Sequence, residues 1–187
     1  MDFLQYLHDF GEHIVMDRVE IYNEVSLQFE LAIYLRNILS DNFRVHVERN
    51  VAFFGLNKGD YLKREMDIAV FTPDKQEKHC FELKFPTQGQ YPEQMFSACK
   101  DIRFLEQLVK SGFNESYFIM FADDPLFYVE KGGESIYKAF RAEKLIKGEI
   151  IKPTGKRDEK LILDGEYKIE WQNLPSKLKY FIVQVKI

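Results

Sequence analysis

Three charged residues in two neighbouring apolar segments of the sequence have the types needed for phosphodiester chemistry. Asp67 lies in EMDIAVF, and Glu82 and Lys84 lie in CFELKF. Charged groups in such segments are costly to bury unless they compensate one another or bind an ion. Two carboxylates suit a hard divalent cation such as Mg²⁺, which prefers oxygen ligands. Such an ion polarises a phosphodiester and acidifies a bound water, while an ammonium group orients that water or stabilises developing charge.

The elements that must position these residues are two β-strands joined by a polar turn. Residues 64–71 and 78–85 are apolar, and the connector TPDKQE between them predicts an antiparallel hairpin. Because side chains alternate along a strand, Glu82 and Lys84 project to one face and their apolar neighbours to the other. Hairpin pairing is then expected to bring the Asp67 carboxylate beside Glu82.

An acidic residue two positions before a lysine is by itself a weak signal. The pattern occurs three times in the chain. The copy ending at Lys160 lies in the polar segment GKRDEK, which is typical of a solvated loop. The copy ending at Lys168 lies in EYKIEW, which is typical of an amphipathic strand with one wet face. Only the Glu82/Lys84 copy lies in an apolar strand that follows a second apolar strand with a central aspartate.

A fourth acidic residue, Glu24, lies in the clearest predicted helix, residues 17–40, which contains no Gly or Pro. Placed at 100° steps, Glu24 falls near the middle of an apolar face. That face comprises Val25, Leu27, Leu31, Ala32, Leu35, Ile38 and Leu39. Two explanations account for an acidic residue on this apolar face. Either the Glu24 carboxylate reaches an ion site at the edge of the sheet, or Glu24 lies in a frayed first turn of the helix, where the helix dipole favours negative charge. The sequence leaves both explanations open.

The remaining segments complete an α/β pattern in a single domain spanning residues 1–187. Further helices are predicted over residues 2–15, 93–111 and 135–148, and further strands over 42–54, 116–122, 148–152 and the segments EYKIEW and KYFIVQVKI. Three polar residues on or before the helix at 93–111 could face the site or a phosphate, although a solvated helix face explains them as well: Gln94, Lys100 and Arg103.

Composition limits the classes of function. Hydrophobic residues make up 45% and charged residues 30% of the 187, which is typical of a globular protein. The start of the chain does not resemble a signal peptide, no apolar run is long enough to span a bilayer, and two cysteines are too few for a disulfide framework. A soluble, cytoplasmic protein without a membrane partner is expected. The net charge of -4 argues against a basic coat for nonspecific nucleic-acid binding.

The order of these elements and residues resembles the core of the PD-(D/E)XK nuclease superfamily. A helix bearing Glu24 is followed by a strand, by Asp67, by Glu82 and Lys84, and then by a helix and another strand. The resemblance covers residues 17–122. It implies a restriction-endonuclease-like core, in which helices flank a central mixed β-sheet, and residues 123–187 then form a β-rich C-terminal extension.

The resemblance also implies a function and a role for each residue. Asp67, Glu82 and the helix acid Glu24 would bind Mg²⁺, or Mn²⁺ in its place, and Lys84 would assist the attacking water, so that all four are implied as catalytic. Met66 stands where the superfamily's name-giving proline would lie, a departure that other members share. The expected activity is hydrolysis of phosphodiester bonds, in DNA rather than RNA, by a Mg²⁺-activated water. A homodimer, common among restriction-type members, is compatible with the resemblance.

Two alternatives remain open. The same fold with a lapsed site would serve as a nucleic-acid-binding or protein-interaction module, but such a member is expected to have lost Asp67, Glu82 or Lys84. In an unrelated α/β domain, the charged residues would be structural ion pairs. That alternative requires several buried charges without a functional purpose, which makes it the weakest of the three.

Overall fold

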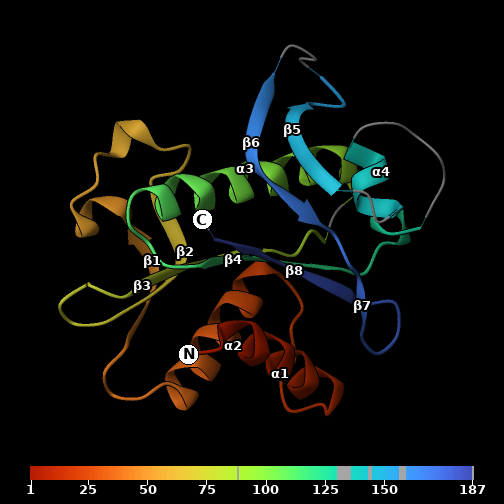
Figure 1. Cartoon of the computed structure of the whole chain (residues 1–187). Helices are drawn as coiled ribbons and strands as arrows, with labels where there is room; N and C mark the ends of the chain where they lie inside the picture. Colours follow the sequence, from red (N-terminus) through yellow and green to blue (C-terminus); the bar gives the residue numbers. More distant parts are fainter. Residues whose placement is uncertain (88, 130–135, 143–144, 156–158, 187) are drawn as a thin grey trace.

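A mixed six-stranded β-sheet forms the centre of the computed structural model, with helices on both of its faces (Figure 1). The structure describes all residues except 88, 130–135, 143–144, 156–158 and 187. Its helices are α1 (Phe3–Val15), α2 (Glu24–Ile38), α3 (Tyr91–Lys110) and α4 (Ile136–Arg141), with 3-10 turns at Val51–Phe54, Lys58–Asp60 and Pro125–Phe127. Its strands are β1 (Arg44–Asn50), β2 (Glu65–Phe71), β3 (Lys78–Lys84), β4 (Ser116–Ala122), β5 (Leu145–Ile151), β6 (Lys160–Lys168), β7 (Gln172–Asn173) and β8 (Lys179–Val185). The predicted α/β class is confirmed.

The strand order of the central sheet is β1-β2-β3-β4-β8-β7. The strands β1, β2 and β3 are successively antiparallel, as the predicted hairpin requires, and β4 then lies parallel to β3 after the crossover through α3. The last long strand of the chain, β8, pairs antiparallel with β4. The C-terminal segment is therefore part of the central sheet and does not only extend it, while β5 and β6 form a separate two-stranded sheet.

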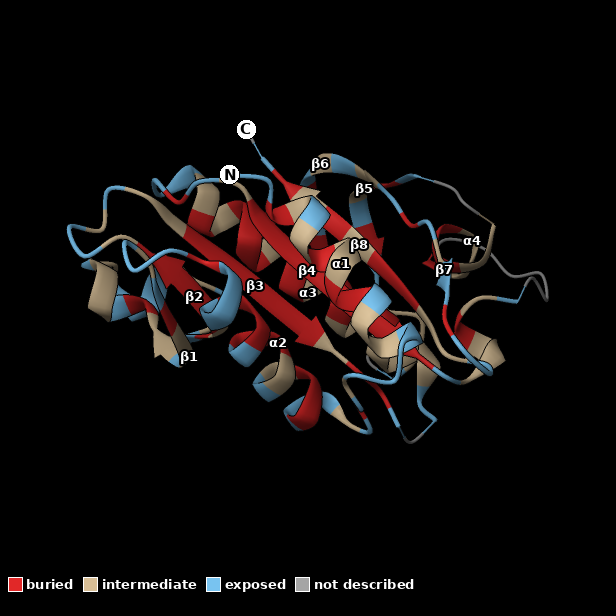
Figure 2. Ribbon diagram, turned by 90° about the horizontal axis from the view of Figure 1, so that it is seen from below, coloured by how far each residue is buried: buried red, intermediate tan, exposed pale blue. Residues whose placement is uncertain are grey.

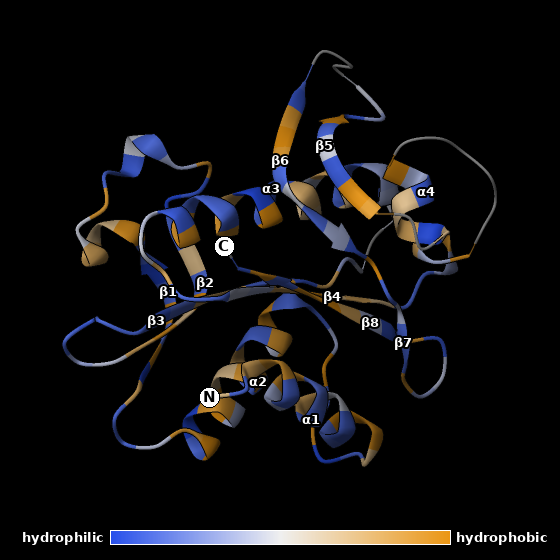
Figure 3. Cartoon of the chain, in the orientation of Figure 1, coloured by the Kyte–Doolittle hydropathy of each residue, from blue (hydrophilic) through white to orange (hydrophobic). Residues whose placement is uncertain are grey.

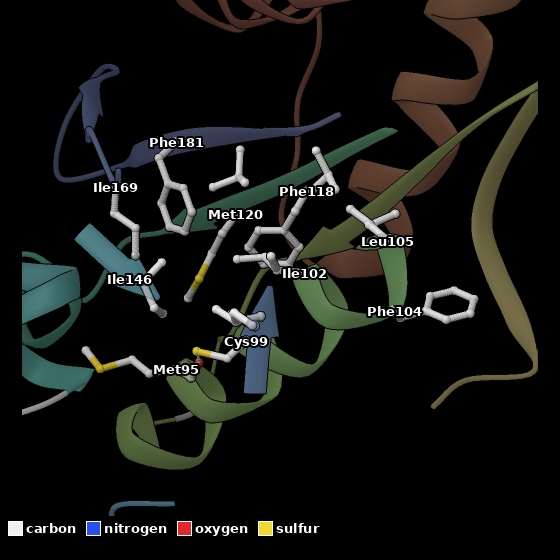
Figure 4. Close-up of a cluster of buried hydrophobic side chains, with 14 of the residues drawn as sticks. Met95, Cys99, Ile102, Phe104, Leu105, Phe118, Met120, Ile146, Ile169 and Phe181 are labelled. Atoms are coloured by element: carbon white, nitrogen blue, oxygen red, sulfur yellow. Dashed lines mark hydrogen bonds between the residues drawn. The ribbon is translucent and has the colours of Figure 1, made fainter. Parts of the chain in front are cut away.

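Two hydrophobic clusters lie on opposite faces of the sheet. Seen from the side of α1 and α2, the inner strands β2, β3 and β4 are buried along most of their length, whereas the edge strands β1 and β7 and the outer surfaces of the helices are partly exposed (Figure 2). The cluster under α1 and α2 includes Phe81, Leu83 and Phe85 of the β3 segment. The other cluster packs α3 and the β5–β6 sheet against the opposite face (Figure 4), and it includes Cys80. The alternation predicted for β3 is thus confirmed, and Glu82 belongs to the α3 face.

Three predicted boundaries were wrong for local reasons. The helix expected from residue 17 begins at Glu24, because Asn23 forms a capping box with Ser26. The helix expected over 135–148 ends at Arg141 within the described residues, because the segment from Leu145 pairs with β6 as strand β5. The predicted strand over 42–54 is limited to Arg44–Asn50, because a 3-10 turn follows at Val51–Phe54.

A buried carboxylate fastens β6 to α3. Glu106 is 2% exposed and accepts hydrogen bonds from the backbone amides of Asp164 (2.9 Å) and Gly165 (2.7 Å) and from the Tyr167 hydroxyl (2.9 Å). Arg103 donates a further hydrogen bond to Glu106 at 2.8 Å, so that both carboxylate oxygens are used. Figure 3 shows how the apolar stretches of β5 and β6 lie above α3. This contact sets the position of β6, which lines one side of the candidate site.

Candidate functional site

The site begins where the hydrogen-bond ladder between β2 and β3 ends. The last backbone pair is Ile68–Phe81. Beyond it, hydrogen bonds between backbone amides and the two predicted carboxylates take the place of backbone–backbone hydrogen bonds. Asp67 Oδ2 accepts a hydrogen bond from the Leu83 amide at 2.8 Å, and Glu82 Oε1 accepts one from the Asp67 amide at 3.3 Å. The strands are therefore held together at this point by the two side chains that the sequence singles out.

A lysine that the sequence reasoning missed joins these carboxylates. The Lys63 ammonium, from the loop before β2, forms ion pairs with Glu82 Oε2, with Asp67 Oδ1 at 3.6 Å and with Asp101 Oδ1 at 3.2 Å. Glu82 is fully buried, and Lys63 is 32% exposed. One cation thus already touches Asp67 and Glu82 together, which places both carboxylates within reach of a single ion.

The third carboxylate of this cluster, Asp101, comes from α3. Its side chain is 5% exposed, and its second oxygen, Oδ2, is buried without a hydrogen bond. Lys84 Nζ lies 3.4 Å from this oxygen. A buried carboxylate oxygen that accepts no hydrogen bond is costly, and its full satisfaction would require a further donor or an ion.

Helix α2 contributes two side chains to the edge of the site. Glu24 is the first residue of the helix, and its Oε2 accepts a hydrogen bond from the Phe85 amide at 3.1 Å and lies 3.8 Å from Lys84 Nζ. Glu24 therefore lies in the first turn of α2, and its side chain also reaches the end of β3 at the edge of the site. Both explanations of this residue, a first-turn position and a contact with the site, thus apply in part. One turn on, Gln28 donates a hydrogen bond to the carbonyl of Asp67 at 2.8 Å.

A hollow of about 400 Å³ opens beside Lys63, Lys84 and Asp101. Four lysines line it, together with two acids and three uncharged residues: Lys63, Lys84, Lys100, Lys160, Asp101, Glu159, Leu62, Ser97 and Leu161. Lysines therefore outnumber acids on this wall, although the whole chain is acidic. All four lysines are ion-paired, Lys160 with Glu149 outside the lining, so an anionic group such as a phosphate would compete with these acids for the ammonium groups.

The secondary candidates on α3 have different surroundings. Lys100 lines this hollow but is ion-paired with Glu159. Gln94 lines a second hollow, of about 390 Å³, together with Glu24 and Phe85. Arg103 points to Glu106 and Asp164, where it supports the attachment of β6.

Burial raises the pKa of both central carboxyl groups. Burial raises the pKa of Asp67 to about 6, although the Lys63 ammonium and the Leu83 amide oppose the shift. Burial and the neighbouring Asp67 hold the pKa of Glu82 well above its usual range. Burial opposes the charged form of Lys63, but Glu82, Asp101 and Asp67 together raise the pKa of this lysine, which is therefore an ammonium. Clustered carboxyl groups with raised pKa values are typical of functional sites.

These shifts predict the pH dependence of ion binding. The Asp67 carboxyl is protonated below its raised pKa of about 6 and then offers no charge to a cation. We expect the affinity for Mn²⁺ to fall by up to about tenfold per pH unit as the pH decreases through this value, since ion binding must release the proton. Isothermal titration calorimetry in two buffers of different ionisation enthalpy measures both the affinity and the protons released. An affinity that stays constant across this range contradicts the prediction.

The sequence contains a signal for Asp101 but not for Lys63. On α3 the positions 98, 101, 105 and 108 share one buried stripe at helical spacing, and an aspartate there is as conspicuous as Glu24 on its own helix. Lys63 lies outside the regular elements, between a 3-10 turn and β2, where no periodicity points to a partner.

Comparisons with family models, with curated proteins and with solved structures found no match to this chain. In the arrangement that the structure shows, no three His, Cys, Asp or Glu side chains of the described part of the chain form a group that could hold a metal ion. No helix among the described residues has the length and apolar character needed to cross a membrane.

Proposed function

We propose that the chain is a metal-dependent nuclease that hydrolyses phosphodiester bonds, in DNA as the favoured substrate. The observation that carries the proposal is the contact of a single cation, the Lys63 ammonium, with both Asp67 and Glu82. The donor set also fits a hard divalent ion, because it consists of carboxylate oxygens and includes Asp101 Oδ2, which is buried without a hydrogen bond. The restriction-endonuclease-like core remains part of the proposal, supported by the antiparallel β1–β2–β3 order, the parallel β4 and the helices on both faces.

Asp67, Glu82 and Asp101 would hold the ion, with Glu24 at the edge of the site. When bound, the ion would polarise the scissile phosphodiester and acidify a water. Lys84 Nζ lies 3.4 Å from Asp101 and 3.8 Å from Glu24, both longer than a typical hydrogen bond of about 3 Å. Its N–H groups are therefore able to donate to a water or a phosphate oxygen at the hollow. The lysines on the wall of the hollow would attract the phosphate backbone of the substrate.

The proposal is tested by incubating the purified chain with plasmid DNA, single-stranded DNA and RNA in the presence of Mg²⁺, Mn²⁺ or a chelator. Asp67→Asn is expected to reduce cleavage by about 10- to 100-fold at limiting metal, since one ligand loses its charge but keeps an oxygen. Asp74→Asn, in the exposed turn at the other end of the same hairpin, is the matched control and should cleave like the native chain. Binding of nucleic acid without cleavage under any condition would favour a lapsed nuclease fold instead.

A further inference from the structure

Lys63 stands at the centre of the three carboxylates that are best placed to bind an ion. Its ammonium contacts Glu82, Asp67 and Asp101, which come from β3, β2 and α3. We propose that Lys63 is a built-in counter-ion of this site, that an incoming divalent cation displaces it, and that Asp101 is the third carboxylate of the ion site. This inference rests on the ion site of the proposed function and concerns how that site is occupied and emptied.

The charge balance of the cluster supports an exchange of cations. In their ionised forms Asp67, Glu82, Asp101 and the edge residue Glu24 carry four negative charges, and the ammonium groups of Lys63 and Lys84 offset only two of them. Replacing the Lys63 ammonium by a divalent ion would offset one more of these charges. Buried charge is least costly when it is fully compensated, and the exchange therefore improves the electrostatics of the site.

Three carboxylates cannot bind a small divalent ion while Lys63 lies between them. Such an ion requires oxygen atoms at about 2 Å, whereas the ammonium holds the Asp67 and Asp101 oxygens at 3.6 and 3.2 Å from its own nitrogen. The ion and the ammonium therefore compete for one position. The Oδ2 atom of Asp101, buried and without a hydrogen bond, is a further oxygen close to this position.

The hollow provides space for the displaced Lys63 side chain. Lys63 is 32% exposed and itself lines the hollow of about 400 Å³, so a change of rotamer carries its ammonium toward solvent without a movement of the strands. In the hollow it would lie on the same wall as Lys100 and Lys160. Loading of the ion would thereby add a positive charge to the surface that a phosphate has to approach.

The test compares binding of Mn²⁺ and Ca²⁺ by the native chain and by Lys63→Met, which keeps the aliphatic stem but removes the charge. Calorimetry at about pH 8 limits competition from protons. We expect Lys63→Met to bind the ion at least about tenfold more tightly, because no charge-assisted hydrogen bonds have to be broken. Lys147→Met, which removes an exposed lysine paired with Glu166, is the matched control and should bind like the native chain.

Two further measurements remain informative if the variant folds poorly. Amine labelling of the native chain should modify Lys63 faster when Mn²⁺ is present, while labelling of Lys147 stays unchanged. Asp101→Asn should weaken binding by about tenfold, as expected for loss of one ligand charge, and Asp74→Asn should not.

The outcomes separate this inference from the proposed function. If the native chain binds the ion but Lys63→Met binds it no more tightly, and the labelling of Lys63 does not change, displacement is refuted while the ion site stands. An unchanged affinity in Asp101→Asn refutes the assignment of the third carboxylate. If neither the native chain nor Lys63→Met binds an ion, the ion site itself is refuted and the inference fails with it.

Discussion

Replacing Lys84 by alanine is expected to lower the rate of metal-dependent cleavage by about 10²- to 10⁴-fold, the range that a positioned proton-transfer or charge-stabilising group supplies. Lys84 lies at the end of β3, is 12% exposed and keeps its ammonium beside the hollow through the longer contacts with Asp101 and Glu24. Alanine removes this charge but none of the carboxylates that would hold the ion. Cleavage at saturating metal should therefore be lost while ion binding is kept, as a single-turnover assay combined with calorimetry would show.

The control for this variant is Lys147→Ala, which removes an exposed lysine on β5 that is paired with Glu166 at 2.6 Å. Its cleavage rate should equal that of the native chain. Thermal unfolding of both variants separates a loss of chemistry from a loss of structure, because Lys84→Ala also leaves Asp101 with one cation fewer. Equal cleavage by the native chain and Lys84→Ala would refute the role assigned to this lysine.

The largest effect on stability is expected at Glu106, which lies on α3 and takes no part in the proposed chemistry. Glu106→Gln keeps the volume of the side chain but turns one acceptor into a donor that faces the amides of Asp164 and Gly165. The loss of a charge-assisted contact with Arg103 and the unsatisfied buried amide are expected to reduce the free energy of unfolding by about 3 kcal/mol. For a chain of this size that lowers Tm by about 10 °C.

Differential scanning calorimetry measures this change. Glu166→Gln is the matched control, since Glu166 lies on β6, the strand that Glu106 holds, but is exposed and pairs with the exposed Lys147. Its free energy of unfolding should change by no more than about 0.5 kcal/mol, as is usual for surface positions. A Tm of Glu106→Gln that equals the native value would mean that the attachment of β6 to α3 does not depend on this carboxylate.

The elements with a regular period could be predicted from the sequence. The β2–β3 hairpin, the strand β4 and the helices α1 and α3 follow from alternation or from helical spacing, and so does the face on which Glu82 lies. The start of α2 was missed because the apolar spacing continues across residues 17–23, and only the capping box of Asn23 with Ser26 marks the boundary. The end of α4 was missed because Leu145–Ile151 forms strand β5 by pairing with β6, and local spacing in the sequence does not indicate this pairing.

The composition of the site was predictable only in part, for a similar reason. Asp67, Glu82 and Lys84 belong to strands whose pairing follows from local pattern, so their proximity could be derived. Asp101 and Lys63 come from a helix and a loop, and their contact with the other carboxylates depends on how α3 and the loop before β2 pack on the sheet. That packing is a tertiary property, and one sequence carries little information about it.

The position of β8 affects when the central sheet is completed during synthesis of the chain. Every residue of β4 is buried, and one of its two edges pairs with β8, which is synthesised more than 50 residues later. Until the ribosome has released Lys179–Val185, this apolar edge has no partner and is open to pairing with other chains. The sheet that supports Asp67 and Glu82 is therefore completed only after Lys179–Val185 has been synthesised, and a nascent chain that lacks this strand leaves one edge of β4 unpaired.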